Sequence, residues 1–160
     1  MLALYLSYVF LRYIYWTNWG QAPHIERARP DGTERQVFIH SAIEFLNSLA
    51  LDEVDKKLFW AGADDNKYGI IEAVSLDGSN RSVIFRQKGY HPYSLDTFED
   101  YVYWTDRGRN AIFRIKSSGG EAEVISERLN NPLGLKILHG REERPGSYSG
   151  SVSRRITFIP

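Results

Sequence analysis

The chain has no cysteine among its 160 residues. A disulfide framework, a thiolate zinc site and a cysteine nucleophile are therefore excluded. It also has no excess of charge of one sign, because 20 Lys and Arg residues balance 20 Asp and Glu residues. A net charge of zero, without runs of like charge, argues against a protein that binds nucleic acid through bulk positive charge.

A long hydrophobic run is missing as well. Residues 1–15 are apolar apart from Ser7 and Arg12, but a membrane-spanning helix needs about 20 apolar residues. A signal peptide would need a basic start and a small-residue cleavage site, and this segment has neither. We therefore interpret it as part of a strand.

The common motifs of enzyme active sites are absent too. There is no Gly-x-Ser-x-Gly, no His-Glu-x-x-His and no phosphate-binding loop. We expect a protein that is not an enzyme and that uses no cofactor and no metal.

Aromatic residues are abundant and regularly placed. Trp16, Trp60 and Trp104 lie 44 residues apart. Each follows another aromatic residue, and these are Tyr15, Phe59 and Tyr103. A period near 44 residues is typical of four-stranded propeller blades.

Offsets within each repeat predict two hairpins per unit. Gly32, Gly78 and Gly119 lie at the same distance after an isoleucine, which indicates a hairpin turn of constant length. Leu51 and Leu95 each precede a repeat tryptophan by nine residues. That spacing predicts a second hairpin, through residues 55–57 in one unit and residues 99–100 in the next. In the middle unit the four predicted strands are residues 47–52, 57–62, 69–75 and 81–86.

The fold class predicted from these repeats is all-β. We expect a partial β-propeller of about three four-stranded blades over residues 1–140, with a closing strand in residues 131–137. Residues 141–160 are rich in Ser, Gly and Arg and break the pattern, so we expect an irregular or disordered tail.

The repeats resemble the YWTD (class B) β-propeller repeats of the low-density-lipoprotein receptor family. Residues 13–20 (Tyr-Ile-Tyr-Trp-Thr-Asn-Trp-Gly) and 98–106 (Phe-Glu-Asp-Tyr-Val-Tyr-Trp-Thr-Asp) carry the likeness most clearly. The family usually has Gly where Ser48 stands and Asp where Gly62 stands. By the resemblance, the structural repeat motif consists of Tyr15, Trp16, Thr17, Asn18, Phe59, Trp60, Tyr103, Trp104, Thr105 and Asp106, with the turn glycines Gly32, Gly78 and Gly119.

The order of the repeats resembles the C-terminal half of a six-bladed propeller of a receptor-related protein. The resemblance implies a fragment of an extracellular, non-catalytic module that binds protein ligands, in endocytosis or signal co-reception. Its further partners would be the missing blades and growth-factor-like modules of the parent receptor, and it would reach the membrane only through that parent. The alternatives are a nidogen-like or growth-factor-precursor-like matrix protein and, less favoured by the motif, a calcium-dependent propeller hydrolase.

Candidate sites are few. We expect the repeated tryptophans to pack between blades, since a scaffold position repeats and a binding site need not. Trp19 lies outside the repeat, in a connection, and His24 lies on a strand where the family often has Lys, so both are candidate ligand contacts. The resemblance implies that a histidine acts as a pH switch in ligand release. The alternative is that each histidine is an ordinary turn or surface residue. Asn80 begins the sequon Asn-Arg-Ser and is a candidate N-glycosylation site.

Overall fold

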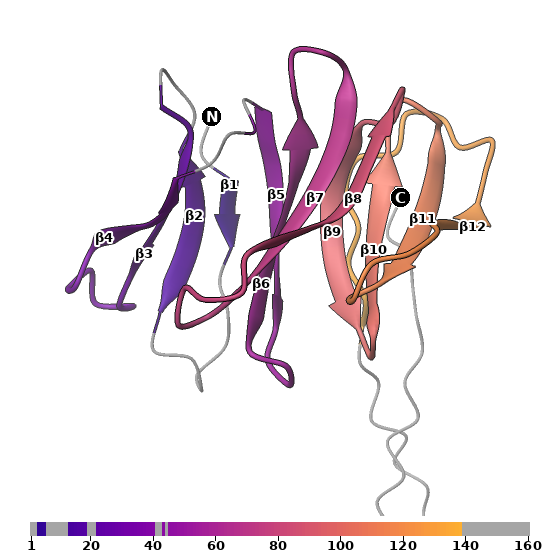
Figure 1. The fold of residues 1–160 in the computed structure, drawn as a ribbon. Coiled ribbons are helices and arrows are strands. Elements are labelled where there is room, and N and C mark those ends of the chain that lie inside the picture. The colour runs from indigo at the N-terminus through magenta and orange to yellow at the C-terminus, as the bar shows by residue number, and fades with distance from the viewer. Residues whose placement is uncertain (1–2, 6–12, 19–21, 41–42, 44, 139–160) are drawn as a thin grey trace, which may run out of the picture.

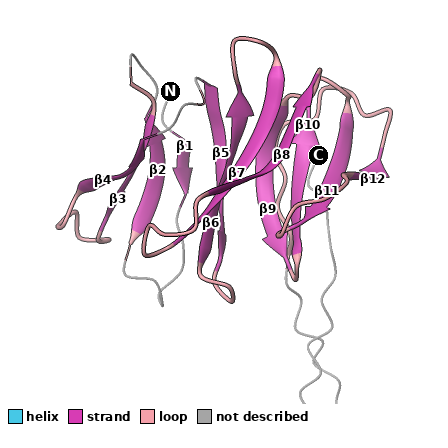
Figure 2. Cartoon of the chain, in the orientation of Figure 1, coloured by secondary structure: helices cyan, strands magenta, loops and turns pink. Residues whose placement is uncertain are grey.

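Twelve strands form three antiparallel sheets in the part of the chain that the computed structural model describes (Figures 1 and 2). The structure describes residues 3–5, 13–18, 22–40, 43 and 45–138, with residues 3–5 described as backbone only. Within these ranges it contains no helix. The predicted all-β class and the three four-stranded units are confirmed. The predicted tail at 141–160 lies outside the described residues, as does Trp19.

Each sheet is a four-stranded meander. The first sheet contains β1 (Ala3–Tyr5), β2 (Ile14–Asn18), β3 (His24–Ala28) and β4 (Gln36–His40). The second contains β5 (Phe45–Asp52), β6 (Lys57–Ala63), β7 (Tyr68–Ser75) and β8 (Ser82–Lys88). The third contains β9 (Pro92–Phe98), β10 (Tyr101–Asp106), β11 (Ala111–Lys116) and β12 (Glu123–Ser126). The sheets stand side by side in chain order, like blades (Figure 1).

The same irregularity recurs in the outer half of every sheet. The ladder between the third and fourth strands shifts register between Ile25 and Glu26, between Ile71 and Glu72, and between Ile112 and Phe113. A bulge increases the local twist of a strand pair. Three bulges at one position therefore give the three blades the same twist, which lets them stack.

The aromatic pair of each repeat joins neighbouring blades. Successive side chains of a strand point to opposite faces. Trp60 packs with Tyr15 in the core between the first two blades, while Phe59 packs with Trp104 in the core between the second and third. Trp60 and Trp104 thus lie against the preceding blade, and Tyr15 and Phe59 lie against the following one.

The predicted equivalence of Leu51 and Leu95 is wrong. Leu95 lies opposite Trp104, but the residue opposite Trp60 is Leu49. The hairpin between β5 and β6 turns through four residues, 53–56, whereas the one between β9 and β10 turns through two, 99–100. The equal spacing of Leu51 and Leu95 from their tryptophans therefore did not reveal that the two turns differ in length. Lys57, predicted in the turn, belongs to β6.

The predicted closing strand is not a strand in the structure. Residues 132–138 have no regular secondary structure, yet Leu135 and Ile137 are buried against Tyr103 of the third blade. The segment is held by side chains of β9 rather than by a backbone ladder, because Leu135 N–H donates to Ser94 Oγ and Ile137 N–H to Asp96 Oδ2.

Candidate functional site

The last residue of the third repeat motif, Asp106, is a fully buried carboxylate that caps backbone amides. Both of its oxygens accept the His91 N–H at 3.0 Å, and Oδ1 also accepts the Arg109 N–H at 3.0 Å. Oδ2 accepts Trp104 Nε1–H at 3.2 Å. The carboxylate therefore ties the turn after β10 to the connection that precedes β9.

Gly62 occupies the corresponding place in the second blade, and nothing larger fits there. A Cβ on Gly62 would lie 1.9 Å from the Phe45 carbonyl oxygen and 2.6 Å from Ile43 Cγ2. The second blade thus replaces the carboxylate cap with close backbone packing.

Two of the tryptophans are held by a glutamate and an arginine. Trp60 Nε1–H donates to Glu72 Oε2 at 2.9 Å. Arg81 pairs with Glu72 at 3.0 Å and lies 5.2 Å from the Trp60 ring centroid. Arg81 Nη1 also donates to the His40 carbonyl at 2.7 Å, so this triad joins the second blade to the first.

The first blade repeats part of this arrangement. Glu26 lies opposite Trp16 and pairs with Arg35 at 2.7 Å, and Arg35 lies 5.5 Å from the Trp16 ring centroid. The hydrogen bond from Arg35, helped by His24, holds the pKa of the Glu26 carboxyl below its usual value. In the third blade Phe113 stands opposite Trp104 instead and stacks on it at 5.4 Å.

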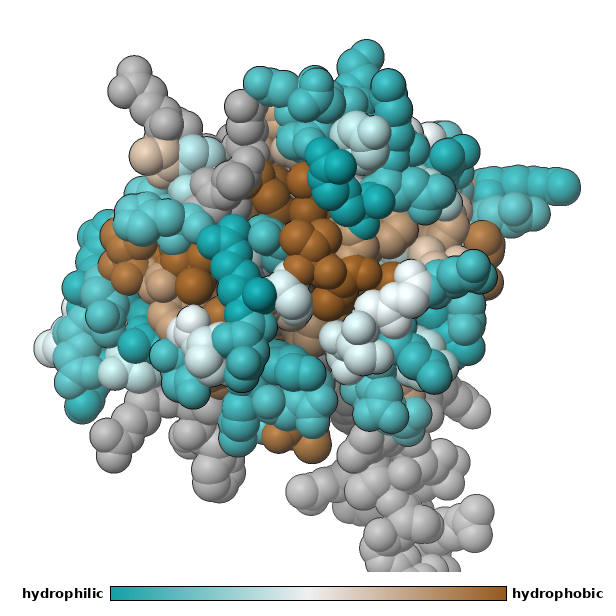
Figure 3. Space-filling view, in the orientation of Figure 1, coloured by the Kyte–Doolittle hydropathy of each residue, from teal (hydrophilic) through white to brown (hydrophobic). Residues whose placement is uncertain are grey.

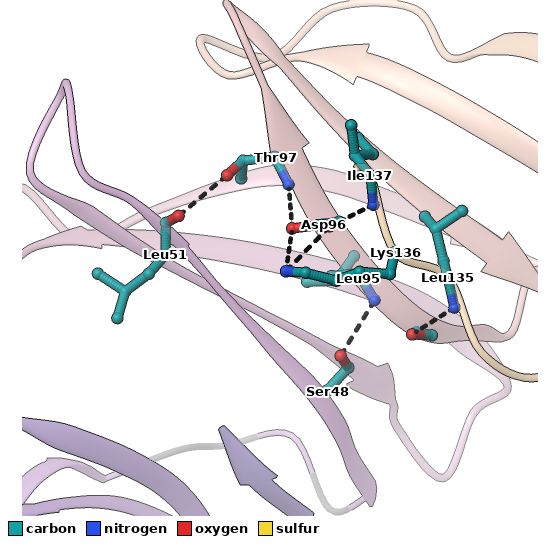
Figure 4. A network of polar contacts seen from close by, with 9 residues as sticks. Ser48, Leu51, Leu95, Asp96, Thr97, Leu135, Lys136 and Ile137 are labelled. Carbon is teal, nitrogen blue, oxygen red and sulfur yellow. Dashed lines mark hydrogen bonds and ion pairs between the residues drawn. The ribbon is translucent and has the colours of Figure 1, made fainter. Parts of the chain in front are cut away.

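Hydroxyl side chains join the first strands of neighbouring blades (Figure 4). Leu95 N–H donates to Ser48 Oγ at 3.0 Å, as Leu135 N–H donates to Ser94 Oγ at 3.1 Å. Thr97 Oγ1 also donates to the Leu51 carbonyl at 3.0 Å. Residues 132–138 therefore meet the third blade as β9 meets the second, in the position of the first strand of a further blade.

His24 lies in a polar cluster at one end of the first blade. Its Nδ1 is 2.7 Å from the Ala22 carbonyl, and its Nε2 is 3.1 Å from Glu26 Oε1 and 3.2 Å from Asn18 Nδ2. The His40 ring centroid is 6.3 Å away. The structure thus brings Asn18, at the end of the first motif, together with the histidine, while Trp19 lies outside the described residues.

At the end of the blades where His24 lies, the connections of the second and third blades are joined to one another by backbone hydrogen bonds. Gly89 N–H donates to the Lys67 carbonyl, Arg107 N–H to the His91 carbonyl, and Leu129 N–H to the Asn110 carbonyl. We call the surface formed by residues 64–67, 88–91, 107–110 and 127–131 the loop face. It is the upper edge of Figure 1, and hydrophilic side chains cover much of the upper part of Figure 3. Four loops thus form one continuous surface on a rigid scaffold.

Asp64, an acidic residue of the loop face, is bound by neighbouring groups of the same chain. Asp64 Oδ1 accepts the Tyr68 N–H at 2.9 Å, and its Oδ2 pairs with Arg86 at 3.0 Å. These contacts, the Tyr68 amide first, keep the pKa of Asp64 below its usual value. Among the described residues no group of three His, Asp or Glu is placed to hold a metal ion. The same ranges contain no helix able to cross a lipid bilayer.

The opposite end of the blades carries the glycine turns. Gly32, Gly78 and Gly119 have φ values of 85°, 90° and 91°, a region that costs glycine little. Asn80 follows the second of these turns, is exposed and has a φ of 55°. Its Nδ2 donates to Ser79 Oγ at 3.1 Å and to Ser75 Oγ at 3.4 Å. Asn80 therefore lies at the far end of the blade from the loop face.

The sequence pattern did not single out the arginines of the loop face. Arg107 and Arg109 flank Gly108, directly after the third motif. Arg107 contacts the ring of Tyr93, in β9, and Arg109 contacts the ring of Tyr90, on the connection before β9. That pairing depends on the inter-loop bonds, and no regular spacing in the chain signals it.

Comparison with known proteins agrees with the fold and the repeats. Residues 12–53 match the family model for the low-density lipoprotein receptor repeat class B. The low-density lipoprotein receptor-related protein 5-like protein of Homo sapiens is 33% identical over 125 residues, which cover 78% of this chain and 48% of that protein. The vitellogenin receptor of Solenopsis invicta is 30% identical over 127 residues, which cover 79% of this chain and 7% of the receptor. The chain thus spans about half of one relative and a small part of the other.

Solved structures share the fold at lower identity. The nidogen/laminin complex contains a chain with a TM-score of 0.61 and 21% identity, and the match covers 77% of this chain and 46% of that one. A gluconolactonase from Xanthomonas campestris has a TM-score of 0.63 at 12% identity, with coverage of 78% and 46%. At such identities the likeness concerns the fold alone. The motif and the two receptor relatives decide the family: the chain belongs to the proteins built from low-density lipoprotein receptor class B repeats, and its three sheets are blades of that type.

Proposed function

We propose that the chain is a non-catalytic, extracellular protein-interaction module of a cell-surface receptor. The single observation that supports this most is how the motif residues are used. The Asp106 carboxylate and the Trp60 indole are both consumed by internal hydrogen bonds. Because these polar groups of the motif are already hydrogen-bonded within the chain, we infer that ligands are bound by the loops that the blades hold in place.

In this proposal the ligand contacts the end of the blades that carries the loop face, which we call the loop end. His24 belongs to that end, beside Asn18 and the connection that contains Trp19. We propose Trp19 and His24 as ligand contacts on the first blade. The relatives that match the chain include a vitellogenin receptor, which supports a protein ligand and a place on the outside of a cell.

Asn80 is proposed as an N-glycosylation acceptor under the same assumption. It is exposed and lies at the end of the blade away from the loop face, so a glycan there leaves the proposed binding end open. Further blades and growth-factor-like modules of a parent receptor remain the proposed covalent neighbours of this chain.

The location of the gene product tests the proposal. An epitope tag is placed in the natural gene, and intact cells are labelled with a membrane-impermeant biotin reagent. A receptor module is labelled on intact cells and stays with the membrane fraction. Recovery from the medium or the matrix instead would favour the nidogen-like alternative. A product that is labelled only after the cells are permeabilised would overturn both. Sequencing the full transcript in the same cells then establishes which modules flank the three blades.

A further inference from the structure

Two arginines on the loop face, Arg107 and Arg109, have no carboxylate partner among the described residues. Most described arginines pair with a carboxylate within 4.0 Å, and these are Arg29, Arg35, Arg81, Arg86, Arg114 and Arg128. Arg27 lies between two aromatic rings and donates to the Leu76 carbonyl. Among the described residues, only Arg107 and Arg109 are exposed arginines without a carboxylate partner.

Both side chains are nevertheless fixed in place. The Arg107 guanidinium carbon lies 5.1 Å from the Tyr93 ring centroid, and Arg107 Nε donates to Asn131 Oδ1 at 3.1 Å. The Arg109 guanidinium carbon lies 4.6 Å from the Tyr90 ring centroid. Stacking of this kind holds the guanidinium plane while its edge remains able to donate hydrogen bonds. Little side-chain entropy is then left to lose when a ligand binds.

The backbone beneath the two arginines is equally constrained. Asp106 accepts the Arg109 N–H, and the His91 carbonyl accepts the Arg107 N–H. Gly108, between them, approaches the neighbouring loop so closely that a Cβ there would lie 2.7 Å from the Gly89 carbonyl oxygen. The turn therefore presents Arg107 and Arg109 in one fixed arrangement. We call these two residues with Tyr90 and Tyr93 the arginine–tyrosine pair site.

The surroundings indicate which anion fits. Lys67 and Lys88 are exposed on the same loop face, but Asp65 is exposed there too, and Arg86 is neutralised by Asp64. The surface is thus moderately basic, which suits a few carboxylates better than a densely sulfated glycan. A planar carboxylate also matches the donor fork of a guanidinium.

We propose that the arginine–tyrosine pair site binds a short acidic segment of a partner protein, with carboxylates received by Arg107 and Arg109. The inference deepens the proposed function, because it names the partner chemistry for the same loop end of the blades. It does not depend on where the protein is located, so the localisation experiment and the binding experiment fail independently.

Binding is measured with the full chain displayed on yeast and a biotinylated hexaglutamate peptide as the probe, with hexaglutamine as the matched peptide. We expect hexaglutamate to bind and the double variant Arg107→Gln/Arg109→Gln to weaken binding about tenfold or more. Arg107→Lys/Arg109→Lys keeps the charge but loses the fork and is expected to bind weakly as well. The control Lys56→Gln/Lys57→Gln removes two charges at the opposite end of the blades and is expected to bind like the unmodified chain.

Display level and resistance to protease are recorded for each variant, so that loss of fold is separated from loss of binding. If the glutamine variant is degraded, the lysine variant decides the question. Equal binding of hexaglutamate and hexaglutamine would overturn the proposal. Equal weakening by the Lys56/Lys57 control would do so too, because bulk charge would then explain the result. A heparin-derived oligosaccharide that binds while hexaglutamate does not would assign the site to sulfated glycans and overturn the acidic-segment proposal.

Discussion

The Asp106 carboxylate receives the His91 backbone N–H through both of its oxygens, 15 positions away along the chain. The same carboxylate also accepts the Arg109 amide and the Trp104 indole N–H. One side chain therefore closes the turn after β10 and anchors the connection before β9. In the third repeat the motif ends in an acid at the point where three different donors converge.

Replacing Asp106 by Ala should destabilise the chain by about 3 kcal/mol, because it leaves three N–H donors without their acceptor in a buried place. Asp106→Asn keeps one acceptor oxygen and should cost about half as much. Urea unfolding followed by tryptophan fluorescence measures both. Asp100→Ala, which removes an exposed carboxylate from the β9–β10 turn, is the control. An Ala variant at position 106 as stable as this control would contradict the capping role.

Gly62→Ala should prevent the second blade from forming correctly. The added methyl group would overlap the Phe45 carbonyl oxygen, and backbone cannot move aside as a flexible side chain can. We expect a loss of more than about 3 kcal/mol. Gly134→Ala is the matched variant, because nothing lies within 4 Å of a Cβ there, and its unfolding midpoint should barely change. Similar midpoints for the two variants would show that the close approach of Gly62 to β5 is absent.

The ion pair of Glu26 with Arg35 should make stability depend on pH. The pKa of Glu26 is lowered in the folded chain, first by the Arg35 hydrogen bond. Its stabilising contribution is therefore present above the pKa of the unfolded chain and is lost as the pH falls through the lowered folded value. Arg35 is largely exposed, so the effect should be below about 1 kcal/mol.

This is checked by comparing melting temperatures at pH 7 and pH 3.5 in the unmodified chain and in Arg35→Gln. The unmodified chain should lose more stability on acidification than the variant. Arg35→Lys retains the charge and should lie between the two. A larger acid loss in Arg35→Gln than in the unmodified chain has the wrong sign for this explanation.

Asn80 should carry a glycan when the chain passes through a secretory pathway. The full chain is expressed in insect cells behind a heterologous leader, and PNGase F should remove a mass that Asn80→Gln and Ser82→Ala lack. Ser82→Thr preserves the sequon and should remain modified. Secreted, protease-resistant chain without a glycan would refute the assignment.

Much of the fold could be predicted because hydrophobic and turn residues repeat locally. The spacing of Trp16, Trp60 and Trp104 identified the blades, and the turn glycines marked one hairpin of each. The second hairpin was placed wrongly through Leu51, since the turn between β5 and β6 is longer than the turn between β9 and β10. Periodicity reports distance along the chain and carries no information on the length of a turn.

The contacts of the candidate site could not be predicted in the same way. Arg107 meets Tyr93 and Asn131 only because four loops are bonded together at one end of the sheets. Residues 131–137 were predicted to be a strand, but the amides of Leu135 and Ile137 donate to the side chains of Ser94 and Asp96. Such pairings arise between elements that are remote in sequence, where a single chain carries no periodic signal.

The opposite orientation of the two aromatic residues in each motif has a consequence for how such chains change length. Tyr15 packs toward the following blade, and Trp104 packs toward the preceding one. If the whole middle unit were excised, the face of the first blade that carries Tyr15 would meet the face of the third blade that carries Trp104. Faces of these two kinds already pack against each other at both interfaces between blades. Removal of half a unit would instead bring together two faces that have no complement. Gain and loss of complete units, with cut points in the connections between blades, are therefore the length changes that this architecture accommodates most readily.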